Sequence, residues 1–177
     1  MNHLDLPVEL FQFTKPIVLE SLPLPKIVTH SWCSIPITDF LTEEGIKWFA
    51  DRNLALRSTA FVFKIIKNFE GPIHIDSVGS VSAGFAFNFV ISGYGSMQWV
   101  NNIEGNENVS YNNDSKYIMY NNVKSFDVTD TWTGNAALVR IDVPHRIISF
   151  DEERYCVSIR TQLGTNPKTF EDAVHMI

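Results

Sequence analysis

The amino-acid sequence predicts a mainly β protein of the jelly-roll or barrel type. Short segments rich in β-branched and aromatic residues follow one another from Ser58 to about residue 162. A single well-capped helix precedes these segments, and no repeat at a longer fixed period interrupts them. Many short strands with one flanking helical region are typical of such folds.

The early helix is predicted over residues 43–53. Thr42 is a suitable N-cap, and two glutamates follow it at the positive end of the helix dipole. One apolar stripe is expected to pack on a sheet, and its members are Ile46, Phe49 and Ala50. A short capped helix is expected at the end of the chain, from Thr169 onward.

The strands are predicted from alternation. From Phe85 to Ile91 the odd-numbered residues are large and apolar, whereas Ala86, Asn88 and Val90 occupy the other face. A turn follows at residues 93–95. The remaining predicted strands are 60–66, 96–100, 117–120, 125–128, 136–143, 146–150 and 154–160. The asparagine-rich segment Asn101–Asp114 is predicted as a long loop, either solvated or a lid over a substrate.

We treat residues 1–177 as one domain, because no internal linker is recognisable. Residues 1–57 are expected to form an N-terminal cover, and residues 58–162 the core. The longest apolar runs are only a few residues long, which indicates a soluble protein without a membrane span. Two cysteines, the absence of a secretory signal and a net charge of -6 favour a cytoplasmic location, and the acidic charge argues against nucleic acid as a partner.

His74 and Asp76 are candidate metal ligands. On a strand, residues two apart point to the same side, so the imidazole and the carboxylate share a face. His145 follows Pro144 at the junction between two predicted strands, where a third ligand fits. Two imidazoles and one carboxylate on one face of iron(II) leave the other face open for oxygen and a co-substrate. Taken singly, the same residues fit a hydrogen-bonded histidine and a turn-capping aspartate.

Arg154 begins a predicted strand in which Arg154, Cys156, Ser158 and Arg160 share one face. A guanidinium offers a planar fork that matches a carboxylate. The alternative is a surface strand with solvated arginines.

These segments together carry a resemblance to a known family. The order is His74-x-Asp76, residues 87–91 leading to Gln98-Trp99, then residues 143–148 and 153–160. It resembles the iron(II)- and 2-oxoglutarate-dependent oxygenases, and is most similar to small phage and marine bacterial members of prolyl-hydroxylase-like type. The resemblance covers roughly residues 58–162 and implies a double-stranded β-helix.

The resemblance also implies roles for single residues. His74, Asp76 and His145 would hold iron, and the basic residue about ten positions after the distal histidine would bind the remote carboxylate of 2-oxoglutarate. Arg154 holds that position, with Arg160 as the fallback, and Asn88 falls where a polar contact to the co-substrate is common. The implied reaction uses Fe(II), 2-oxoglutarate and O2 to hydroxylate a small-molecule or peptidyl substrate, and yields succinate and CO2.

Three alternatives remain open. A cupin enzyme with three histidines and one glutamate would share the fold, but the chain lacks the His-x-His cluster that such a site needs. Hydroxylases without the carboxylate ligand are similar downstream, yet Asp76 departs from their pattern. The third alternative is a non-catalytic jelly-roll module for binding or structure. The oligomeric state and the substrate are not readable from the sequence.

Overall fold

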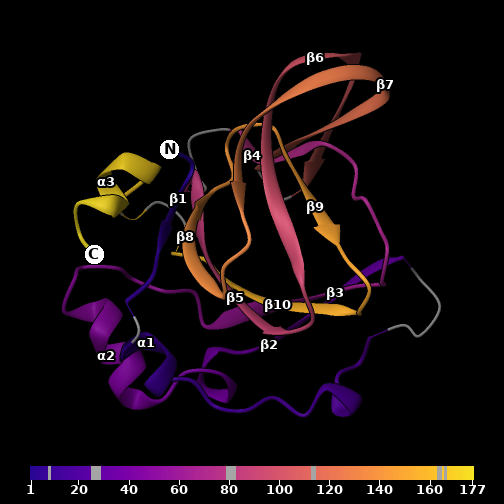
Figure 1. Ribbon diagram of the computed structural model, residues 1–177. Helices are drawn as coiled ribbons and strands as arrows, with labels where there is room; N and C mark the ends of the chain where they lie inside the picture. The colour runs from indigo at the N-terminus through magenta and orange to yellow at the C-terminus, as the bar shows by residue number, and fades with distance from the viewer. Residues whose placement is uncertain (8, 25–28, 79–82, 113–114, 163–164, 166) are drawn as a thin grey trace.

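A computed structural model describes residues 1–177 apart from residues 8, 25–28, 79–82, 113–114, 163–164 and 166 (Figure 1). Two β-sheets dominate it. The strands of the larger sheet, in spatial order, are β1 (His3–Asp5), β8 (Ala136–Arg140), β5 (Phe85–Ser92), β10 (Arg154–Ile159), β3 (Thr59–Ile65) and β2 (His30–Pro36). The strands of the smaller sheet, which closes on itself, are β4 (His74–Val78), β7 (Ser115–Trp132), β6 (Gly95–Asn112) and β9 (His145–Ser149).

Consecutive strands from β3 to β10 alternate between the two sheets, except at the hairpin that joins β6 to β7. All the pairings are antiparallel. This winding is that of a double-stranded β-helix, or jelly roll. The predicted mainly β fold class is therefore confirmed.

Strand β5 shows how the sequence alternation builds two separate interiors. Phe85, Phe87 and Phe89 face outward from the roll into a large apolar cluster that the N-terminal segments cover. Ala86 and Val90 face the space between the two sheets and pack with a smaller apolar cluster there. The predicted alternation along this strand is confirmed, and it places a polar residue of the same face inside the roll.

The helices lie on the outside of the roll (Figure 1). They are α1 (Glu9–Gln12), α2 (Glu43–Ala50), α3 (Phe170–Val174) and the short 3-10 turns η1 (Leu19–Ser21) and η2 (Ile37–Asp39). The side chain of Thr42 accepts a hydrogen bond from the backbone N–H of Gly45, at 3.2 Å, as its predicted capping role requires. Thr169 caps α3 in the same way, so both predicted helices are confirmed.

The predicted stripe of α2 needs a correction. The helix ends at Ala50 rather than at residue 53, and Ala50 is exposed. The buried residues are Gly45, Trp48 and Phe49. The chain turns after Ala50 because Asn53 adopts a positive φ of 57°, which ends the helical path.

The prediction of a long loop at Asn101–Asp114 is wrong for the residues described. Residues 101–112 are the outer part of β6 and pair with β7, which also joins the predicted strands 117–120 and 125–128 into one; residues 113 and 114 lie outside the described residues. Asn102 and Asn122 take positive φ values, and the pairing register shifts near them. The two asparagines thus adopt the backbone conformation that the irregular positions of the hairpin require. The segment is paired by cross-strand hydrogen bonds and does not form the expected loop.

No helix of the described residues has the length and apolar character that a membrane span requires.

Candidate metal centre

Strand β4 presents His74 and Asp76 on one face. Ile73 and Ile75 are buried on the opposite face, so the alternation of the segment fixes the direction of both polar side chains. In the ladder between β4 and β9, His74 is the direct partner of His145. Two residues far apart in the sequence are therefore brought side by side by strand pairing.

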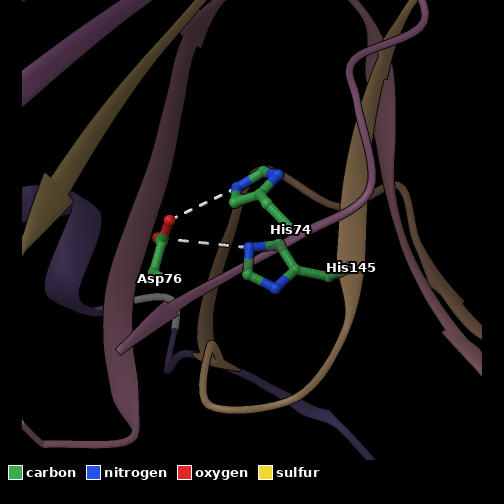
Figure 2. A group of neighbouring side chains, drawn as sticks. All are labelled: His74, Asp76 and His145. Carbon is green, nitrogen blue, oxygen red and sulfur yellow. Dashed lines mark ion pairs between the residues drawn. The ribbon is translucent and has the colours of Figure 1, made fainter. Parts of the chain in front are cut away.

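The three predicted ligands form one compact group (Figure 2). One ligand atom from each of them lies within 4.8 Å of the others. Nε2 of His74 is 3.3 Å from Oδ1 of Asp76, and Nε2 of His145 is 4.0 Å from Oδ2 of the same carboxylate. These three side chains can hold a metal ion.

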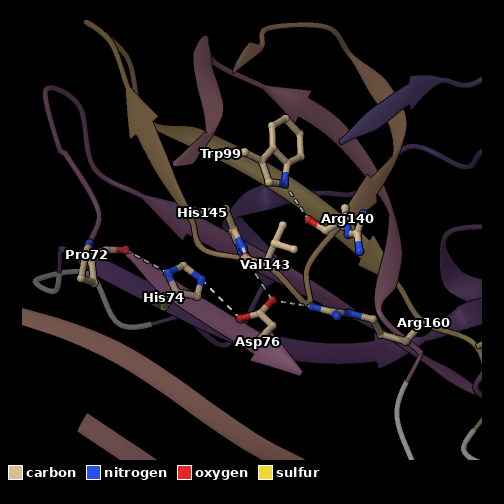
Figure 3. A network of polar contacts seen from close by, with 8 residues as sticks. All are labelled: Pro72, His74, Asp76, Trp99, Arg140, Val143, His145 and Arg160. Carbon is tan, nitrogen blue, oxygen red and sulfur yellow. Dashed lines mark hydrogen bonds and ion pairs between the residues drawn. The ribbon is translucent and has the colours of Figure 1, made fainter. Parts of the chain in front are cut away.

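Both imidazoles are oriented by the backbone (Figure 3). Nδ1 of His74 lies 2.9 Å from the carbonyl oxygen of Pro72, and Nδ1 of His145 lies 2.9 Å from that of Val143. Since a carbonyl only accepts, each Nδ1 carries a proton, and the Nε2 atom of each imidazole is the one that faces Asp76. This backbone contact is the usual one behind a metal-bound histidine.

The electrostatics of the three residues are unequal. Burial lowers the pKa of His145 to about 4, and the charge of His74 acts in the same direction. Burial also lowers the pKa of His74. The hydrogen bond and the charge interaction of His74 with Asp76 outweigh burial, so the net effect is a raised pKa. Burial would raise the pKa of Asp76, yet the contacts with His74 and Arg160 hold it well below its usual value. At neutral pH the site therefore holds one carboxylate and a neutral His145.

Arg160 contacts the carboxylate from the other side. Its Nη2 donates to Oδ2 of Asp76 at 2.9 Å. The arginine thereby occupies one carboxylate oxygen and leaves Oδ1 facing His74 (Figure 3). This pairing makes Arg160 an orienting group for Asp76, rather than a free cation available to an anionic ligand.

Arg154 differs from Arg160 in having no carboxylate beside it within the described part of the chain. The residue is 2% exposed, and its Nε has no hydrogen-bond partner among the described residues. Gly95 lies directly over it, since a Cβ on that glycine would be 2.8 Å from Cδ of Arg154. A buried guanidinium without a counter-charge is costly, so the geometry suits a bound anion.

The three ligands, Arg154 and Arg160 line one cavity of about 310 Å³. Asn88 also lines it, and its buried Oδ1 lacks a partner among the described residues. All six residues singled out from the sequence thus meet in one place. Cys156 lies there too as a buried free thiol whose pKa is raised by burial, and with Cys33 it is an unpaired core cysteine.

The sequence did not point to several other residues of this cavity. They come from strands β2, β3 and β7 and from the segment before β4, and they are His30, Trp32, Phe63, Phe69, Tyr117 and Met119. Tyr117 lies against His74, with 5.6 Å between ring centroids. Aromatic residues in strands are common in cores, so their composition carried no signal for a site.

No family model and no curated protein matches the chain. Among solved structures it is similar to vicilin from hazelnut, Corylus avellana, at 9% identity and a TM-score of 0.42, over 81% of this chain and 32% of that chain. It is also similar to oxalate decarboxylase from Lactobacillus farciminis, in a formate complex, at 8% identity and a TM-score of 0.41, over 83% of this chain and 33% of that chain. Oxalate decarboxylase from Bacillus subtilis is similar at 10% identity and a TM-score of 0.40, over 86% of this chain and 29% of that chain.

The chain thus spans about a third of the length of these proteins. At such TM-scores the similarity carries no argument about function. The jelly-roll assignment rests on the strand order described above.

Proposed function

We propose that the protein is a non-haem oxygenase that uses Fe(II), 2-oxoglutarate and O2 to hydroxylate a small-molecule or peptidyl substrate. One observation carries the proposal: the cavity that holds His74, Asp76 and His145 also holds a buried arginine without a carboxylate partner among the described residues. A metal site and an anion site in one cavity are what a metal-chelating dicarboxylic co-substrate requires.

The donor set fits a divalent metal such as iron(II). Two imidazole nitrogens and one carboxylate oxygen form a three-ligand group that leaves further coordination positions open. The Nδ1 contacts with backbone carbonyls and the Arg160 contact with Asp76 supply the outer support that such ligands need.

Arg154 is the residue we expect to bind the remote carboxylate of 2-oxoglutarate. It can satisfy the anion with two parallel hydrogen bonds, and the anion would neutralise a buried charge that has no carboxylate beside it among the described residues. Arg160 is less suited, because Asp76 already occupies it. Asn88 lines the same cavity, and the NH2 of its side chain can donate to the co-substrate.

When bound, iron(II) and 2-oxoglutarate supply the oxidising chemistry, in which one oxygen atom of O2 enters a C–H bond and the other enters succinate as CO2 leaves. The chain's own residues position the reactants. Arg154 orients the co-substrate, Arg160 orients Asp76, and the buried apolar residues Met97 and Ile141 exclude water from the inner end of the cavity.

The test is spectroscopic. The purified protein with anaerobic Fe(II) and 2-oxoglutarate should develop a weak visible charge-transfer band, and should slowly form succinate when oxygen is admitted. The band should be absent from His145→Ala and present in the control His175→Ala, which removes an exposed histidine outside the cavity.

The opposite result is equally clear. If the wild-type protein stays colourless and forms no succinate, the oxygenase proposal is rejected. The non-catalytic jelly-roll module for binding or structure then stands in its place.

A further inference from the structure

Strand β2 forms one edge of the larger sheet and pairs with β3 alone among the described strands. The N–H of Ile66 donates to the carbonyl of Thr29, and the N–H of Ile37 donates to that of Ser58. Hydrogen-bonded pairs recur at every second residue of an antiparallel ladder, so the odd-numbered residues of β2 bond to β3. The backbone groups of His30, Trp32 and Ser34 therefore point to the open side.

These outward groups have no backbone partner in the part of the chain that the structure describes. The strand also lacks the protection that exposed edges usually have, since its sequence HSWCSIP contains no lysine, arginine, aspartate or glutamate. Only Pro36, at its end, limits pairing. A row of donors and acceptors at strand spacing is complementary to another main chain.

Two of these three residues also face the cavity of the metal centre. His30 and Trp32 line it, and Trp32 is 56% exposed although it is a large aromatic residue. Trp32 packs edge-on against Phe61, and His30 stacks on Phe63, with ring centroids 5.5 Å and 5.8 Å apart. These four residues form an aromatic strip beside the cavity, with His30 and Trp32 exposed on the edge strand and Phe61 and Phe63 partly buried on β3.

The cavity is small for its expected content. Its volume of about 310 Å³ lies at the lower end of the range for small-molecule sites, and 2-oxoglutarate would occupy part of it. The remaining room suits an amino-acid side chain or a group of similar size. A larger substrate would extend outside, where β2 and its aromatic strip begin.

We propose that the open edge of β2 binds an extended peptide segment, which adds a strand beside residues 30–34 and directs one of its side chains into the cavity. The inference rests on the proposed function and makes it more specific, since it selects a peptidyl over a free small-molecule substrate. Alternate side chains of the bound segment face the aromatic strip, so they are apolar or aromatic and uncharged.

A second copy of the chain is a poorer occupant of this edge. If β2 paired with itself along its full length in antiparallel register, the two ends of the strand would lie opposite one another, and Pro36 would face His30 in both halves. Proline has no N–H to give to a ladder, so each end of such a pair would be weakened. A separate peptide needs only the part of β2 before Pro36.

The experiment measures peptide binding without iron, 2-oxoglutarate or oxygen, so it can fail independently of the oxygenase test. A pool of short random peptides displayed on phage is selected against the immobilised protein. Recovered peptides should alternate apolar and other residues, and one synthesised peptide should bind about tenfold more weakly to Ser34→Pro, because that change removes an outward N–H and spares the ladder with β3. The matched control Ser34→Ala keeps the N–H and should bind as the wild type does.

Amide hydrogen exchange of the wild-type protein gives a second measurement that does not depend on the folding of a variant. The recovered peptide should slow exchange at His30, Trp32 and Ser34, the three outward amides. The proposal is overturned if no peptide is enriched, if Ser34→Pro binds as well as Ser34→Ala, or if these amides exchange at unchanged rates. It is also overturned if light scattering shows a dimer of the wild-type protein that Ser34→Pro abolishes.

Discussion

The two faces of the larger sheet bury very different side chains. On the outer face, Phe87 packs against Phe49 of helix α2 with ring centroids 4.8 Å apart, inside the large apolar cluster. On the inner face, the neighbouring positions hold Asn88, Arg154 and Ser158, which line the cavity. A sheet that is stabilised from outside by its N-terminal cover can therefore tolerate costly polar groups inside the roll. The predictions below test this division.

The largest expected effect is on the outer face. Phe87→Ala removes a fully buried ring and should lower the free energy of unfolding by about 3–5 kcal/mol, because it leaves a cavity that its neighbours cannot fill. Thermal and denaturant unfolding measure the loss. Below the melting transition, Mn²⁺ binding per folded molecule should be unchanged, and a large loss of metal affinity would show that the two faces are not separate.

On the inner face, Arg154→Met should act in two opposite directions. Binding of 2-oxoglutarate to the metal-loaded protein should weaken by about a hundredfold, since the anchoring cation is gone. The metal-free protein should become more stable, because a buried charge without a carboxylate partner among the described residues is replaced by an apolar side chain. Calorimetry gives both values. A fall in stability would mean that Arg154 has a structural role.

Arg160→Gln should affect the metal rather than the co-substrate. Loss of the contact with Oδ2 frees Asp76 to rotate, so Mn²⁺ affinity should fall by about 10–100-fold. Electron paramagnetic resonance of the bound ion measures this affinity. If the variant instead binds metal normally and loses 2-oxoglutarate, the roles assigned to the two arginines are reversed.

Metal binding should depend on pH through His74. Its pKa is raised above the ordinary value of 6.5, and a metal must displace its proton from Nε2. As the pH falls through that raised pKa, Mn²⁺ affinity should therefore drop, by about tenfold per pH unit. His145 adds nothing until the pH approaches about 4, because its pKa lies there. An affinity that stays constant from mildly alkaline to mildly acidic pH contradicts the prediction.

The smallest effect is expected at the N-cap of α2 in the cover. Thr42→Ala removes the acceptor for the N–H of Gly45 and should cost about 1 kcal/mol of stability, measured by denaturant unfolding. Thr42→Ser keeps the acceptor and serves as the control. Neither change should alter the metal affinity. An altered affinity would show that the N-terminal cover and the metal site inside the roll are not independent.

Local sequence rules were sufficient where the determining contacts are local. The hydroxyl of Thr42 caps the turn that immediately follows it, and the alternation around Phe87 reports on two faces of one strand. They failed for residues 101–112, because the partners of these residues lie across the hairpin in β7. A high asparagine content indicates turns, but it does not show whether the irregular positions lie in a loop or within a pair of strands.

The same distinction applies to the site. The spacing of His74 and Asp76 predicted a shared face, and the position of Arg154 in its strand predicted that it faces the same side as Arg160. The alternation along the strand did not separate the two arginines, and only the resemblance, through the distance from His145, favoured Arg154 over Arg160. Their difference arises because only Arg160 comes within 2.9 Å of Asp76.

By itself, the sequence determined the mainly β class, the two helix caps and the residue types able to bind a metal, because these depend on neighbours within a few positions. Only the tertiary structure decided that β4 and β9 pair, which arginine has a partner, and that Trp32 borders the cavity. The physical reason is that strand pairing joins residues distant in the chain, and their contacts depend on register and not on local composition.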